Sequence, residues 1–124
     1  MKYVILIHCN PAAWDALTDE QHRAIGRRHL AFTDELEASG ELIVSEALAD
    51  PSLARTVPAT IPASDALVSD GPYAEAKEYL AGFYLLECES LDRVVAHAER
   101  LPHGPHYRIE VRPVMNLNAV LDQA

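Results

Sequence analysis

His29 is the residue best placed for proton transfer in this sequence, because an imidazole can give or take a proton near neutral pH. It falls on one face of a predicted helix, in a stripe made of His22, Ile25, His29, Phe32, Leu36 and Ser39. A partner carboxylate would fix the tautomer of His29 and stabilise its cation. The alternative is a core histidine bonded to a backbone carbonyl, and the spacing alone favours that alternative.

Asp70 is the carboxylate that we expect beside His29. It opens the sequence Asp70-Gly71-Pro72, which predicts a turn, because aspartate can bond nearby amides, glycine is permissive and proline fixes φ. The turn is a sufficient reason for an aspartate here. An aspartate held in a turn is also well oriented for chemistry, so the sequence leaves both roles open.

Three further residues are candidates for lining the same pocket. His8 ends a predicted strand and could approach His22 or His29. Tyr73 could line the pocket or simply pack, and Lys77 could neutralise an anionic substrate or bond Asp70. The ordinary reading of Lys77 is a solvated loop charge.

The sequence predicts neither a metal nor a cofactor. Among the six histidines there is no HxxxH or HxH pair, and His22 and His29 lie about 10 Å apart along a helix axis, which is too far to share an ion. A glycine-rich phosphate loop, a GxSxG elbow and a CxxC pair are also absent.

The elements that must position these residues alternate between strands and helices. Apolar runs predict strands at 3–8, 41–49, 80–88 and 107–114, with a short hairpin of 55–60 and 66–69. A capping box at Thr18 and Gln21 starts the first helix, which runs to Ser39 and stops at Gly40; Ser90 caps a second helix that ends at Pro102. Gly82, inside the most hydrophobic strand, indicates a bend or a close backbone approach.

This order predicts a single α+β domain over residues 1–124, built as a ferredoxin-like pair of split β-α-β units with an inserted hairpin. Both helices would cover one face of the sheet. The other face needs a cover, and a second copy of the chain is the simplest one. We therefore expect a homodimer through the sheet face.

Composition narrows the partners and the location. The net charge of −9 argues against nucleic acid and against an anionic membrane surface, both of which require clustered Lys and Arg. The two cysteines, Cys9 and Cys88, are too few for a disulfide scaffold and are expected as buried, reduced thiols. The apolar run after Met1 is too short for a signal peptide or a membrane span, so we expect a cytoplasmic protein.

A specific motif string covers the second half of the chain: SDGPYAEAKEYLAGFYLLECESLDRVVAHAERLP at 69–102, then IEVRPV at 109–114. YVILIH near the start, Trp14 and His29 continue the pattern. Over almost its whole length the sequence resembles the YCII-related proteins that carry the DGPF motif, with Tyr73 in place of the motif's phenylalanine. This resemblance implies a ferredoxin-like dimer, often described as a dimeric α+β barrel.

The resemblance also implies a range of functions. The family's chemistry is mostly unassigned, although its broader branch includes a dehydrochlorinase that acts on a chlorinated hydroxyquinol. A His–acid pair is the usual proposal, and it maps onto His29 and Asp70; some relatives place the acid after the first strand, where this chain has Cys9 and Asn10.

We consider two hypotheses. The first is a cofactor-independent enzyme that transfers protons in isomerisation, elimination or hydrolytic dehalogenation of a small cyclic substrate. The second is a non-catalytic ligand-binding or regulatory dimer, since genes of this family often neighbour those of alternative sigma factors. A purely structural dimer with a vestigial pocket is a further reading.

Overall fold

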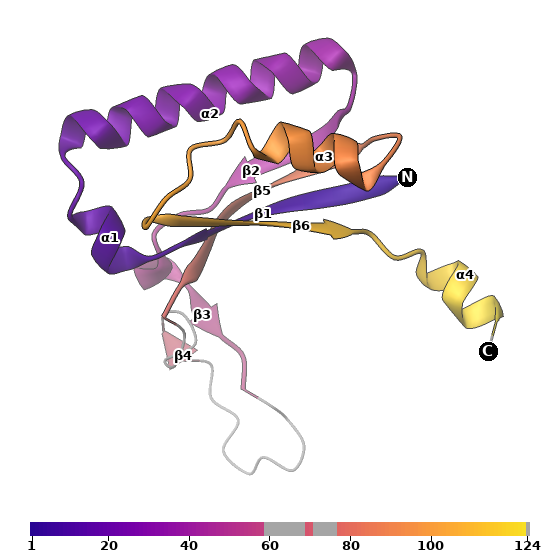
Figure 1. Cartoon of the computed structure of the whole chain (residues 1–124). Helices are drawn as coiled ribbons and strands as arrows, with labels where there is room; N and C mark the ends of the chain where they lie inside the picture. The colour runs from indigo at the N-terminus through magenta and orange to yellow at the C-terminus, as the bar shows by residue number, and fades with distance from the viewer. Residues whose placement is uncertain (59–68, 71–76, 124) are drawn as a thin grey trace.

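A computed structural model describes residues 1–58, 69, 70 and 77–123 of the chain (Figure 1). Its main sheet is antiparallel and open, with the strand order β2-β5-β1-β6. The strands are β1 (Lys2–Cys9), β2 (Leu42–Ala47), β5 (Tyr79–Glu87) and β6 (Tyr107–Pro113). The helices are α1 (Pro11–Asp15), α2 (Asp19–Ser39), α3 (Leu91–Ala98) and α4 (Leu117–Asp122), with a 3-10 turn at Pro51–Leu53.

The main elements form two successive β-α-β units, β1-α2-β2 and β5-α3-β6, and α2 and α3 lie on the same face of the sheet (Figure 1). The predicted α+β class and the predicted order of these elements are confirmed. Because β1 and β5 occupy the centre of the sheet, the side chains that they point toward α2 are the most deeply enclosed.

Helix α2 carries the predicted stripe and forms for the predicted reasons. The Thr18 side chain accepts from the backbone of Gln21 while the Gln21 side chain accepts from the backbone of Thr18, which satisfies two donors at the helix start. Gly40 ends the helix with φ of 77°, a conformation that glycine adopts without a steric penalty. Phe32 and Leu36 are fully buried, so the stripe faces the sheet.

The core lies between the sheet and the two helices. Along β1, alternate residues are buried on the helix side: Tyr3, Ile5, Ile7 and Cys9. Tyr3, Ile5 and Ile7 belong to one core cluster with Phe32 and Leu36 of α2, Leu86 of β5 and Val94 of α3. Cys9 and Cys88 are both buried and free, as expected.

Strand β5 bends at Gly82, as predicted. The pairing of β1 with β5 shifts register after Ile7, which pairs with Gly82 while His8 pairs with Leu80. A Cβ atom at position 82 would lie 2.8 Å from the backbone oxygen of Glu46 on β2. Glycine is therefore required here by the close approach of the neighbouring strand.

Two short helices were not expected from the sequence. After the first strand the Asn10 side chain accepts from the amide of Ala13 and Pro11 supplies a preformed first helical residue, so α1 begins there. Asn116 caps α4 in the same way.

Part of the inserted hairpin lies within the described residues, and the predicted strand positions 59, 60 and 66–68 lie outside them. Its strands are β3 (Arg55–Thr56) and β4 (Ser69–Asp70), paired Arg55 with Asp70 and Thr56 with Ser69. The backbone of Asp70 thus belongs to a strand, and the rest of the predicted turn, Gly71 and Pro72, lies outside the described residues.

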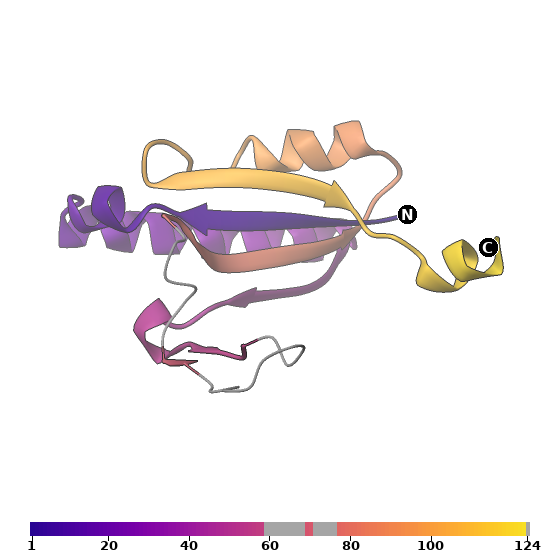
Figure 2. The same ribbon diagram turned by 90° about the horizontal axis from the view of Figure 1, so that it is seen from below.

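The opposite face of the sheet carries none of the described helices (Figure 2). Helix α4 projects beyond the end of β6, away from the sheet, in both views. Within the described part of the chain, no helix combines the length and apolar character needed to cross a bilayer.

Candidate functional site

A cavity of about 570 Å³ lies between α2 and the sheet. Its walls come from α1, α2 and strands β1, β2, β5 and β6. The lining is mainly apolar and aromatic, and its polar side chains include His22, His29, Thr33 and Tyr84. Such an apolar cavity with a few converging polar groups is typical of a small-molecule site.

His29 is the polar side chain held most firmly in this cavity. Its Nδ1 lies 2.7 Å from the hydroxyl of Tyr84, and the two rings are nearly parallel, with centroids 6.1 Å apart. Tyr107 meets the imidazole edge-on at 5.8 Å. The predicted helix stripe therefore does bring His29 into a pocket.

The other nitrogen of His29, Nε2, is buried without a hydrogen-bond partner among the described residues. Burial lowers the pKa of His29, and the neighbouring Arg28 guanidinium lowers it further. At neutral pH the imidazole is therefore uncharged. A buried polar atom without a partner is uncommon in folded proteins and marks a place where a ligand atom can bind.

The hydrogen bond between His29 and Tyr84 can form with either tautomer of the neutral imidazole. With the proton on Nδ1, the Tyr84 hydroxyl accepts from Nδ1–H of His29, and a lone pair is left on Nε2. Burial raises the pKa of Tyr84, so its hydroxyl keeps its proton. The Thr33 hydroxyl, next to this pair, donates to the backbone carbonyl of His29 at 3.0 Å.

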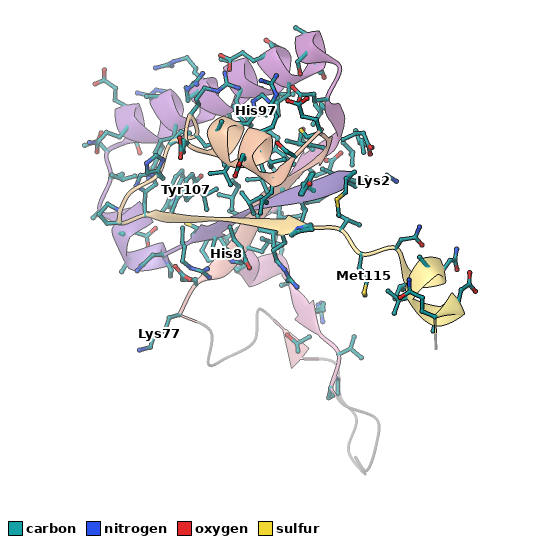
Figure 3. The ribbon with its side chains drawn as sticks, turned by 45° about the vertical axis from the view of Figure 1, so that its right-hand side comes forward. Lys2, His8, Lys77, His97, Tyr107 and Met115 are labelled. Atoms are coloured by element: carbon teal, nitrogen blue, oxygen red, sulfur yellow. The ribbon has the colours of Figure 1, made fainter. Side chains whose placement is uncertain are left out.

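Aromatic rings close the α1 end of the cavity. Trp14 stacks on His22 with centroids 4.2 Å apart and on Tyr107 at 5.7 Å. His22 Nε2–H donates to the backbone oxygen of Trp14 at 2.8 Å, which ties α2 to α1. Figure 3 shows Tyr107 on the helix side of β6.

Tyr84, Tyr107 and Trp14 were not singled out as site residues from the sequence. Tyr84 lies in the most hydrophobic run of the sequence, where an aromatic residue is expected to be part of the core. The alternation along the strand does predict that Tyr84 points toward the helices, because it shares its face with the buried Leu86, two residues later.

The structure does not bring His8 to His29. His8 alternates with the buried Ile7 and Cys9, so it lies on the opposite face of the sheet, where its Nε2 bonds Glu110 at 2.8 Å. Lys77 is exposed and points away from the domain (Figure 3). Tyr73 and the side chain of Asp70 lie outside the described part of the structure, so the acid partner of His29 stays a prediction.

A second polar cluster joins α3 to the end of α2. Ligand-type atoms of Glu41, Cys88 and His97 lie within 4.8 Å of one another. Arg93 holds the Glu41 carboxylate with two hydrogen bonds of 3.0 and 3.1 Å, and Arg100 donates to His97 Nδ1 at 2.7 Å.

Hydrogen bonds inside this cluster account for its geometry. Because His97 Nδ1 accepts from Arg100, its Nε2–H donates to Glu41, and the Cys88 thiol donates to the same carboxylate. Arg93 beside Glu41 holds the pKa of that carboxyl far below its usual range, and burial raises the pKa of the Cys88 thiol to about 12. The two guanidinium groups disfavour the binding of a metal cation here, so we assign a structural role to the cluster.

Comparisons with known proteins agree with the motif string. A family model described as YCII-related domain matches residues 1–118. An uncharacterised protein of Rhizobium meliloti (strain 1021) is 32% identical over an alignment 124 positions long. The alignment covers 92% of this chain and 92% of the relative. The matched region includes every residue that lines the cavity.

Proposed function

This chain belongs to the family of YCII-related domains, and on that premise we propose that it binds a small cyclic molecule beside His29 and moves a proton on it without a cofactor. The observation that carries the proposal is the buried Nε2 of His29, which has no partner among the described residues, in a cavity with aromatic walls. The family itself has no common activity from which to start.

In this proposal Nε2 of His29 takes a proton from an O–H or an activated C–H of the ligand. The positive charge that forms is stabilised by the hydrogen bond from Nδ1–H to the Tyr84 oxygen. The same Nε2–H then returns the proton to another atom, which gives isomerisation, or the ligand expels a leaving group, which gives elimination. Because burial lowers the pKa of His29, its cation gives the proton back readily.

Asp70 is the proposed acid partner, as a second acid–base group. The phenol of Tyr84 already occupies Nδ1 of His29. An acid partner must therefore act on the ligand or near Nε2 and not as the orienting group of the imidazole.

A non-catalytic binding pocket is the second candidate, and one observation favours it. Among the described residues, none of the carboxylates bonds His29, and the partner of its Nδ1 is a neutral hydroxyl. A pocket of this kind can hold a ligand with one polar group without any chemistry.

We also propose that a second copy of the chain covers the open face of the sheet, in a ferredoxin-like dimer. Apolar side chains, half-buried except for the exposed Val44, form contiguous cross-strand rows on this face: Val4 pairs with Leu85, which pairs with Val44, and Leu6 pairs with Phe83. Charged residues of β6, Arg108, Glu110 and Arg112, border them.

Light scattering coupled to size exclusion tests this dimer. The wild type is expected at twice the chain mass and Leu85→Glu at the chain mass, while Leu91→Glu, at an exposed leucine of α3 on the other side of the sheet, stays dimeric. A monomeric wild type at micromolar concentration rules the dimer out.

Quenching of the fluorescence of Trp14, the only tryptophan, tests the binding site, with 4-methylphenol as the probe. The wild type should bind it saturably. His29→Gln should weaken binding about fivefold or more, because one hydrogen bond is lost, while His103→Gln, at an exposed histidine, leaves it unchanged. Equal binding by His29→Gln and wild type contradicts the proposal.

A further inference from the structure

The cavity holds a second histidine with a nitrogen available to a ligand. His22 lines the cavity together with His29, and its Nε2–H is committed to the backbone oxygen of Trp14. A carbonyl only accepts, so in the neutral ring the lone pair lies on Nδ1. No hydrogen bond to this atom is found within the described part of the chain. With the Nδ1-protonated tautomer proposed for His29, two lone pairs, on His22 Nδ1 and His29 Nε2, thus belong to side chains that line one cavity.

Gly26 lies between the two histidines on the same wall of α2. A glycine inside a helix lowers helix stability, so its presence calls for a reason. A Cβ atom at position 26 would meet nothing within 4 Å, and Gly26 is not among the residues with positive φ. Neither packing nor backbone conformation requires glycine here. Its effect is to leave the wall between His22 and His29 free of a side chain.

The spacing of the two histidines sets the size of what can bind. Seven residues of helix separate them by about 10 Å along its axis, and with this spacing taken for the two ring nitrogens, two hydrogen bonds of about 2.8 Å leave roughly 5 Å between the ligand atoms that they hold. One six-membered ring with substituents at opposite positions spans such a gap. The stacked rings of Trp14 and Tyr107 provide flat apolar walls beside it.

We infer that His22 is the second binding residue of this cavity and that Gly26 leaves the space between His22 and His29 for the ring of the ligand. Both nitrogens accept, so the ligand carries an O–H or N–H donor at each of two opposite ends. This inference rests on the proposed function, because it assigns a ligand class to the same cavity. It also predicts that groups that can only accept, such as carboxylates, are poor ligands at either end.

Three phenols test the inference in the Trp14 fluorescence titration, read as titration midpoints. 4-Methylphenol carries one donor, 4-(hydroxymethyl)phenol carries donors at opposite ends, and 2-(hydroxymethyl)phenol carries them side by side. Wild-type protein should bind the opposite-end compound about fivefold more tightly than the other two, the effect of one added hydrogen bond.

Two variants separate the roles of the residues. His22→Phe keeps a ring against Trp14 but lacks Nδ1, so it should lose the fivefold preference while binding 4-methylphenol within about twofold of wild type. His103→Phe, outside the cavity, is the matched control and should keep the preference. Gly26→Leu fills the gap and should weaken all three phenols at least tenfold, with a smaller loss for Gly26→Ala.

The outcomes separate this inference from the proposed function. If the wild type binds all three phenols equally, or if His22→Phe keeps the full preference, the inference is overturned and the proposed binding site stands. If Gly26→Leu binds the phenols as tightly as the wild type does, the role assigned to Gly26 is overturned. This test holds even if His22→Phe fails to fold. If none of the phenols quenches Trp14 saturably, the binding site itself is refuted.

Discussion

His29 Nδ1 and the Tyr84 hydroxyl are 2.7 Å apart, and this bond joins the middle of α2 to the central strand β5. In the proposed tautomer Nδ1–H donates to the Tyr84 oxygen, and the buried Nε2 carries a lone pair. The chemistry proposed for this protein follows from that single arrangement.

Tyr84→Phe should destabilise the protein by about 1–3 kcal/mol, because it leaves Nδ1–H of His29 buried without an acceptor. Tyr3→Phe is the matched control: Tyr3 is equally buried on the same side of the sheet, but its hydroxyl bonds only the Met1 sulfur at 3.4 Å. Urea unfolding measures both. A loss for Tyr84→Phe no larger than that for Tyr3→Phe speaks against the bond.

The stability of the protein should fall as pH drops below about 6.5. Burial lowers the folded-state pKa of His29 and of His106, so below the unfolded pKa the unfolded chain binds more protons than the folded one. Their contribution is therefore complete above about pH 6.5 and is lost as pH falls toward the folded pKa. His29→Gln should reduce the difference in unfolding free energy between about pH 7 and pH 5, and His106 contributes to the part that is left. An unchanged pH dependence in His29→Gln contradicts the lowered pKa.

Sequence patterns predict the framework of the site well but not its contacts. Thr18, Gln21 and Gly40 are local signals, and they fix the bounds of α2 and the inward direction of His29. The partner of His29 is 55 residues away, and only the pairing of β5 in the sheet centre places Tyr84 opposite it. Strand alternation, in contrast, already separates His8 from His29, since Ile7 and Cys9 are the buried neighbours.

The Glu41 cluster illustrates the same limit. Cys88 was expected as a buried thiol, but nothing local links Glu41, at the start of one strand, with His97 on a later helix. Folding brings three segments to one carboxylate. Long-range polar networks of this kind leave no periodic signal in the sequence.

Glu41→Gln should destabilise the protein by about 2–3 kcal/mol, because the carboxylate accepts from Arg93, His97 and Cys88 and charged hydrogen bonds carry that weight. Glu37→Gln, at an exposed position two residues before the end of α2, should have almost no effect. Chemical denaturation near neutral pH gives both values. If the two variants are equally stable, the network does not hold α3 to the sheet.

The two glycines of the cavity should respond to alanine with opposite signs. Gly26→Ala should raise the unfolding free energy by about 0.5–1 kcal/mol, because alanine favours the helix and its Cβ meets nothing. Gly82→Ala should lower it by about 1–3 kcal/mol, because the Cβ would press on the Glu46 carbonyl and force β2 away from β5. Thermal unfolding shows both signs in one experiment, and a stabilised Gly82→Ala would refute the close approach of the strands.

The nitrogen chemical shifts of His29, recorded near neutral pH with and without 4-methylphenol, test the central claim most directly. The account predicts a neutral ring with its proton on Nδ1, and an Nε2 resonance that shifts saturably as the phenol binds, while the resonances of His103 stay in place. A proton on Nε2 in the free protein, or an Nε2 resonance that ignores the ligand, would contradict the assignment of His29 as the proton-accepting group of this cavity.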